Sequence, residues 1–135
     1  MCWFLYGAVN GDIDEKELDK INSAHRCRLT QGTKHELKTA VLSDNCDYRI
    51  TAGFRVCDCE SEIGTHHTDA VEVIDFAALL NEICALPGAK TVSFCKTWVH
   101  ERNKRECQLV CSQTDLRRLL ADLEPRTLYT ISCQD

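Results

Sequence analysis

Apolar residues recur along this chain with two different periods, and each period predicts one type of secondary structure. Alternation of apolar and polar positions predicts a strand at 48–56, and a run rich in aromatic and branched residues predicts one at 2–9. Further strands are predicted at 90–99, 106–111 and 126–133. Apolar residues spaced three and four apart predict helices at 12–27, 69–86 and 114–124, with a shorter helix at 34–43. The short segment is also compatible with a strand at 36–42. Asn10-Gly11 and Pro87-Gly88 supply turns between these elements.

The order of these elements predicts the fold class. From residue 48 onward it is strand, helix, strand, strand, helix, strand, which is typical of a ferredoxin-like split βαβ sandwich in the α+β class. We therefore expect a single domain, 1–135, in which residues 46–135 form the βαββαβ unit. Residues 1–45 add an N-terminal strand and one or two helices. In this arrangement both helices cover one face of an antiparallel sheet, and the segments 90–99 and 106–111 form a hairpin.

A free sheet edge or face predicts association with a second copy of the chain. Unpaired strand edges readily pair, and homodimers are the commonest oligomers. We therefore expect a homodimer, with Trp3, Tyr6 and Trp98 as candidates for its surface, although burial within one subunit is an equal alternative.

Composition and charge narrow the classes of function. The chain has 135 residues, 44% hydrophobic and 27% charged, and a net charge of -5, which argues against general nucleic-acid binding. No apolar run approaches the roughly 18 residues that a membrane helix needs. The apolar N-terminus lacks the positive charge of a signal peptide, so we expect a cytoplasmic protein. Its 10 cysteines should then be reduced thiols, several of them core residues.

One loop concentrates side chains that bind metals. Cys57 and Cys59 follow the predicted strand 48–56, and His66 and His67 follow a few residues later. Thiolates and imidazoles are the ligands of tetrahedral zinc sites, so these four residues are a candidate zinc site. Cys46 is excluded because the strand separates it from the loop by about 30 Å. Nearby carboxylates are candidate substitutes for one histidine, namely those of Asp58, Glu60, Glu62 and Asp69.

The same loop allows two other interpretations. Its two thiols would form a redox pair if the pKa of one were lowered, but we expect the flanking carboxylates to raise thiol pKa values. In a hydrolytic version of the metal site, Glu60 or Glu62 would act as general base on a metal-bound water. The plainest alternative is a polar loop with two incidental thiols.

Cys2 suggests a separate chemistry. Removal of Met1 would place a free α-amine beside the Cys2 thiol, the arrangement of N-terminal nucleophile hydrolases, in which the amine serves as base. The opening Met1-Cys2 followed by an apolar strand resembles the start of class II glutamine amidotransferases. The resemblance covers only this strand, and the arginine and Asn-Gly elements of that family are not placed elsewhere in the chain.

Basic residues gather around the predicted hairpin, and they complete the set of candidate sites. Lys96, Trp98, Arg102 and Arg105 are candidates for binding an anionic ligand, with a solvated turn as the alternative. No catalytic constellation is assigned. We therefore interpret the chain as a non-catalytic binding or regulatory module for an unknown small ligand or protein partner. The alternative function is a zinc-type metal-binding protein, structural or hydrolytic.

Overall fold

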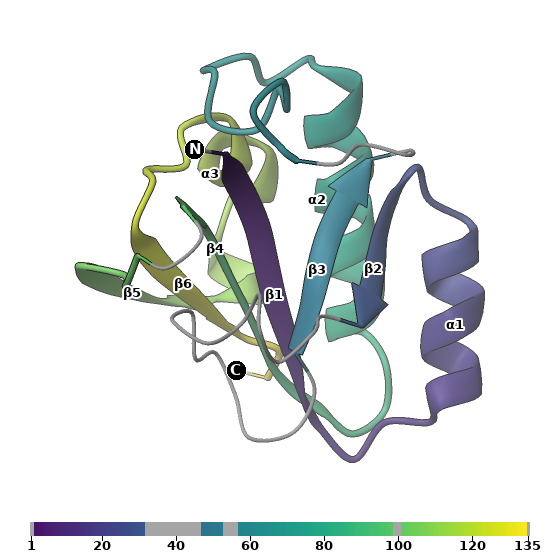
Figure 1. Cartoon of the computed structure of the whole chain (residues 1–135). Helices are drawn as coiled ribbons and strands as arrows, with labels where there is room; N and C mark the ends of the chain where they lie inside the picture. The colour runs from purple at the N-terminus through teal and green to yellow at the C-terminus, as the bar shows by residue number, and fades with distance from the viewer. Residues whose placement is uncertain (1, 32–46, 53–56, 99–100, 135) are drawn as a thin grey trace.

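In the part of the chain that the structure describes, six strands form one mixed sheet, and three α-helices pack on it (Figure 1). The computed structural model describes residues 2–31, 47–52, 57–98 and 101–134. In chain order the elements are β1 (Trp3–Gly11), α1 (Glu15–Ser23), β2 (Cys27–Gln31), β3 (Asp47–Ala52), α2 (Val71–Cys84), β4 (Ala89–Trp98), β5 (Arg105–Val110), a 3-10 helix (Cys111–Gln113), α3 (Leu116–Ala121) and β6 (Thr127–Ser132).

Sheet order places the N-terminal strand near the centre of the sheet. The strands follow the order β2-β3-β1-β4-β6-β5, so β1 separates β3 from β4. β1 is antiparallel to both of these neighbours, and Leu5 stands opposite Ile50 on one side and Lys96 on the other. The start of β1 therefore lies beside the end of β3, which is where the cysteine-containing loop begins.

The predicted α+β class is confirmed, and the predicted hairpin is wrong. β6 lies between β4 and β5, and β5 pairs with β6 in parallel, so the sheet is mixed rather than antiparallel. Burial explains this choice: alternate residues of β6 are buried, including Tyr129 and Ile131, whereas β5 is largely exposed. The more apolar strand takes the interior position and the polar one becomes an edge. The ferredoxin-like arrangement specifically is not confirmed.

Two further differences concern the first half of the chain. Residues 27–31 form β2, a strand that the sequence does not predict, and Cys27 belongs to this strand rather than to the end of the predicted helix 12–27. Cys27 and Leu29 alternate with exposed Arg28 and Thr30 and are buried under α2. α1 already ends at Ser23. The helix predicted at 34–43 lies outside the described residues, as does Cys46.

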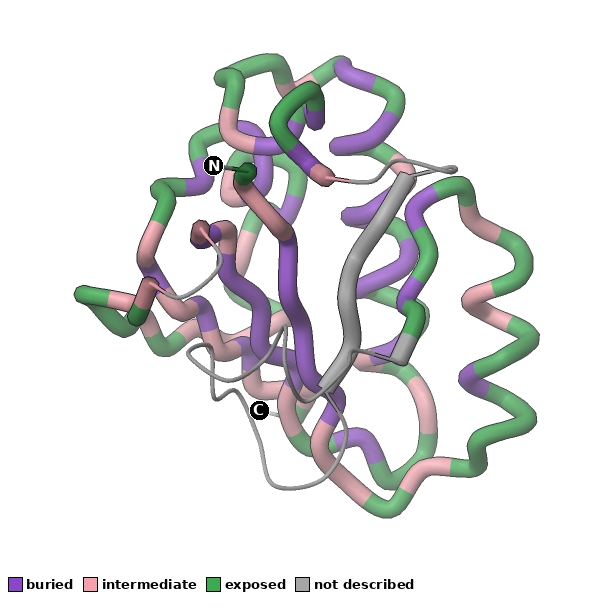
Figure 2. The backbone as a smooth tube through the Cα atoms, in the orientation of Figure 1, coloured by how far each residue is buried: buried purple, intermediate pink, exposed green. Residues whose placement is uncertain are grey.

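The main core lies between the sheet and its helices, and buried residues concentrate on the strands and the inner side of α2 (Figure 2). Phe76 on α2 meets Phe94 on β4 edge to face, with ring centroids 6.0 Å apart. A smaller cluster of Tyr6, Ala8 and Cys95 occupies the other face of the sheet and is also buried. These positions, including the predicted dimer residue Tyr6, are therefore covered within the single chain.

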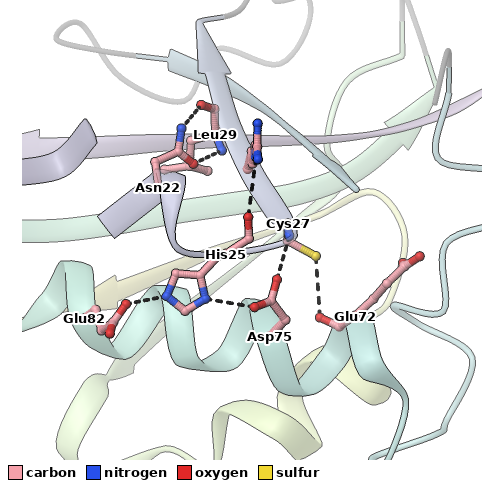
Figure 3. A network of polar contacts seen from close by, with 8 residues as sticks. Asn22, His25, Cys27, Leu29, Glu72, Asp75 and Glu82 are labelled. Carbon is pink, nitrogen blue, oxygen red and sulfur yellow. Dashed lines mark hydrogen bonds and ion pairs between the residues drawn. The ribbon is translucent and has the colours of Figure 1, made fainter. Parts of the chain in front are cut away.

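A polar network joins the α1–β2 connection to α2 (Figure 3). The His25 ring lies between two carboxylates of α2: its Nδ1 is 2.9 Å from Asp75, and its Nε2 contacts Glu82. Asp75 also accepts the backbone N–H of Cys27 at 2.6 Å. This network fixes the start of β2 against the helix that follows the cysteine-containing loop.

The His25 network predicts a pH-dependent stability. Burial lowers the pKa of His25, but hydrogen bonds to Glu82 and Asp75 outweigh burial, and the net pKa is raised above 6.5. A raised folded-state pKa gives stability that is complete below pH 6.5 and is lost as the pH rises through the folded value. We expect His25→Gln to cost about 1.5 kcal/mol at pH 6, at the low end for charged hydrogen bonds because Glu82 is half exposed.

Urea unfolding at pH 6 and pH 8.5 measures this effect. The difference between wild type and His25→Gln should shrink at the higher pH. An equal difference at both values would show that the pKa of His25 does not differ between the folded and the unfolded protein, which would contradict the raised pKa.

Candidate metal centre

Three thiols from distant parts of the chain meet at one end of the sheet. The sulfur atoms of Cys2, Cys57 and Cys59 all lie within 4.8 Å of one another. Cys2 precedes β1, and the other two lie in the turn that opens the loop between β3 and α2. Cys2 and Cys59 are exposed and Cys57 is half-buried, so an ion can reach all three from solvent.

Backbone contacts with β1 hold this turn in place. Asp58 lies between the two cysteines and is 1% exposed. Its carboxylate accepts the N–H of Leu5 at 2.8 Å, and its own N–H donates to the carbonyl of Trp3 at 2.9 Å. The N–H of Trp3 donates to the Cys59 sulfur at 3.3 Å. Because one buried side chain anchors the turn from inside, its neighbours on either side remain at the surface.

The rest of the loop is fixed to α2 and β4. Glu72, in the first turn of α2, accepts the Ser61 hydroxyl at 2.9 Å and the N–H of Glu62 at 3.1 Å. Ile63 is buried, and its carbonyl accepts the Lys96 ammonium at 3.0 Å. The loop is therefore attached at several points before any ligand binds, which lowers the ordering cost of forming a site.

Local hydrogen bonds favour a thiolate at the cluster. The pKa of Cys57 is lowered by three hydrogen bonds, from the Cys59 backbone N–H, the Cys59 thiol and the Cys2 thiol. The shared hydrogen bond to Cys57 raises the pKa of Cys2. Asp58 raises the pKa of Cys57, as predicted for a flanking carboxylate, but these hydrogen bonds have the larger effect and the net pKa of Cys57 is lowered.

Lys96 on β4 places a positive charge beside the loop. It is half-buried, and burial lowers its pKa, while the negative charges of Asp58, Cys59 and Glu72 act in the opposite direction. The sequence predicts Lys96 as a ligand-binding residue at a hairpin. The hairpin does not form, because β6 lies between β4 and β5, and the Lys96 ammonium donates to the loop carbonyl of Ile63 and interacts electrostatically with the cysteine turn. Ligand binding by Lys96 stays a prediction.

The predicted histidine ligands lie elsewhere on the loop. Nδ1 of the His66 ring is 2.8 Å from the Asp122 carboxylate. The backbone N–H of His66 donates to the carbonyl of Ala121 at the end of α3. His67 is exposed. Among the described residues, neither histidine belongs to the group of thiols that lies close enough to share an ion. These two contacts attach His66 to the end of α3.

The predicted carboxylate substitutes are not part of the cluster either. Asp58 is turned inward, and Asp69 pairs with Arg117 at 2.9 Å. Glu60 and Glu62 are exposed, and within the described residues the cluster contains neither of them.

The remaining predicted binding residues are divided between two places. Trp98 packs on Trp3 with ring centroids 4.8 Å apart, and the Arg126 guanidinium lies 5.3 Å from the Trp98 ring centroid. Arg105 pairs with Glu124 at 3.2 Å and borders a hollow of about 450 Å³, which Trp3 and Arg126 also line. Arg102 is exposed. The sequence did not reveal Trp3 and Arg126 at this hollow, because only the sheet order brings them together.

The three thiols satisfy the dimensions of a metal site. Sulfurs bound to zinc at about 2.3 Å in a tetrahedral site lie about 3.8 Å apart. Separations of up to 4.8 Å need only small side-chain rotations to reach that value. The cluster can therefore hold a metal ion through three protein ligands.

Comparison with protein-family models, curated proteins and solved structures finds no match for this chain. In the part of the chain that the structure describes, no helix has the length and apolar composition that crossing a bilayer requires. The function of the chain is therefore inferred from the geometry of the molecule itself.

Proposed function

We propose that this chain is a metal-binding protein that holds one zinc ion through Cys2, Cys57 and Cys59. The observation that supports the proposal is the convergence of three thiol sulfurs within 4.8 Å of one another on a turn anchored by buried contacts. Thiolates select soft and borderline ions such as Zn²⁺ and Cu⁺. The fully thiolate donor set distinguishes this proposal from the cysteine and histidine site predicted by the sequence.

A non-catalytic role fits the site better than hydrolysis. Structural zinc sites have four protein ligands, whereas three leave one position for a further ligand. Only thiols make up the cluster among the described residues, and we assign no general base to it. We therefore propose a binding or regulatory module whose open metal position accepts a ligand from a small molecule or a partner protein.

Zinc affinity of single-cysteine variants tests the proposal. Competition with a chromophoric chelator, under reducing conditions, should give one zinc per chain for the wild type. Each of three variants, Cys2→Ser, Cys57→Ser and Cys59→Ser, should lower the zinc affinity by at least about a hundredfold. Such a loss is larger than the usual effect of removing a residue that only hydrogen-bonds to a metal ligand. Cys107→Ser is the matched control, because Cys107 is half-buried like Cys57 and lies on β5.

A second variant separates the thiolate site from the site predicted by sequence. His66→Ala combined with His67→Ala should change zinc affinity by less than about threefold, since neither histidine lies in the cluster. Loss of binding in this double variant, together with unchanged binding in Cys2→Ser, would overturn the thiolate site in favour of a cysteine and histidine site.

We propose the reducing cytoplasm and a homodimer as the setting for this site. The cysteines in the described part of the chain are free thiols, which suits a reducing compartment. Strands β2 and β5 end the sheet and offer edges for pairing with a second copy. Sedimentation equilibrium would test the dimer, and a monomer at all concentrations would exclude it.

A further inference from the structure

A second group of thiols lies at the other end of α2. Cys84 is the last residue of α2, and Cys133 directly follows β6. Their sulfur atoms are 3.1 Å apart and share a hydrogen bond. Both residues are half-buried, so they are held by packing and remain reachable from solvent. Two thiols in direct contact are placed to become a disulfide with little movement of either side chain.

A third thiol adjoins this pair. Cys111 begins the 3-10 helix after β5, and its sulfur is 3.7 Å from the side-chain oxygen of Asn81 on α2. It also interacts with Cys84. Within the described residues the three do not converge as the cluster at Cys57 does, because only that cluster brings three ligand atoms within 4.8 Å. The geometry is that of a contacting pair with a neighbouring thiol, and it favours redox chemistry over metal binding.

This pair is separate from the metal centre. The loop that carries Cys57 is attached to the first turn of α2 through Glu72, whereas Cys84 closes the last turn. α2 has 14 residues, so its ends are about 21 Å apart. Figure 1 shows the start of β1 and the end of β6 at opposite ends of the sheet. Oxidation of the pair and metal binding can therefore be measured independently.

We propose that Cys84 and Cys133 form a reversible disulfide that ties the end of α2 to the end of β6. The oxidant class is a low-molecular-weight disulfide such as glutathione disulfide. The Cys133 thiolate attacks one sulfur of the oxidant, which releases one glutathione thiolate and forms a mixed disulfide. Cys84 then attacks the Cys133 sulfur and releases the second glutathione, which takes up the proton lost by Cys84. In all, two protein thiols are oxidised and one glutathione disulfide is reduced to two thiols.

The environment of the pair assigns these two roles. Hydrogen bonding to Cys84 lowers the pKa of Cys133, while hydrogen bonding to Cys133, together with burial, raises the pKa of Cys84. When the reduced pair loses a proton, the negative charge therefore resides on Cys133, which is the arrangement of an attacking and a resolving thiol.

Mass spectrometry after oxidation identifies the bond directly. The reduced protein is equilibrated with glutathione disulfide, remaining thiols are alkylated in denaturant, and the chain is cut with trypsin and a glutamate-specific protease. Cleavage after Glu82, Lys90 and Arg126 places Cys84 in peptide 83–90 and Cys133 in peptide 127–135, each without another cysteine. We expect these two peptides to be disulfide-linked, and the link to disappear after treatment with reduced glutathione. Alkylated Cys84 and Cys133 under these conditions would overturn the proposal.

Unfolding in urea supplies a second readout. A disulfide that spans 49 residues restricts the unfolded chain, and oxidation should raise the urea midpoint by roughly 1–2 M. The increase should be absent in Cys84→Ser and in Cys133→Ser, and should persist in Cys107→Ser. An equal increase in all four proteins would assign the effect to another pair of cysteines and contradict the proposal.

Discussion

Zinc at a hundredfold excess over its dissociation constant is expected to raise the free energy of unfolding by about 2.7 kcal/mol. The reason is that the three thiols come together only in the folded chain: Cys2 belongs to the start of β1, and Cys57 and Cys59 to the turn after β3. Urea unfolding with and without zinc, in the presence of a phosphine reductant that does not compete for the ion, measures the increase.

The control for this prediction is a pair of variants with equal numbers of thiols. Cys57→Ser and Cys107→Ser each remove one of the 10 cysteines, so zinc binding to the unfolded chain is matched between them. The increase should vanish in Cys57→Ser and remain in Cys107→Ser. Equal stabilisation of the two variants would show that the ion binds outside the proposed site.

Replacing Asp58 by Ala is expected to cost about 2–4 kcal/mol in the metal-free protein and to weaken zinc binding as well. The substitution leaves the N–H of the buried Leu5 without its acceptor and takes a negative charge away from the half-buried Lys96. It also releases the turn that positions Cys57 and Cys59. Denaturant unfolding measures the loss of stability, and chelator competition measures the affinity.

Asp58→Asn separates the two contributions of this side chain. The amide oxygen can still accept the N–H of Leu5, but the charge that faces Lys96 is lost. We expect this variant to lose about half as much stability as Asp58→Ala. If both variants unfold at the wild-type urea concentration, the buried carboxylate does not hold the turn in place.

Local patterns predicted most of the strands and helices, because periodicity depends on neighbouring residues alone. The segment 69–86 was predicted as a helix, and α2 occupies most of it, since its apolar positions and the Pro87-Gly88 stop are all local. The pairing of β5 was not predictable in this way. A short polar connection favours a hairpin, but the apolar character of the later strand β6 decides the order of the sheet.

Local sequence patterns also predicted only part of the candidate site. Cys57 and Cys59 were found because they are close in sequence, and Cys2 was missed as a partner because the sheet brings it there. One signal could have found it: if the first strand pairs antiparallel with the strand before the loop, its start lies beside the loop. The sequence predicts His66 and His67 as ligands because imidazole binds zinc and both lie near the two thiols in the chain, but the structure attaches His66 to the end of α3.

X-ray absorption at the zinc edge would decide whether three sulfurs bind the ion. The protein is loaded with one equivalent of zinc under reducing conditions, and the nearest shell of atoms is analysed. We predict three sulfur neighbours at about 2.3 Å with one lighter atom completing the shell. Cys2→Ser should lower the sulfur count while Cys107→Ser should not. A shell of nitrogen and oxygen alone, or a sulfur count that Cys2→Ser leaves unchanged, would contradict the proposed site.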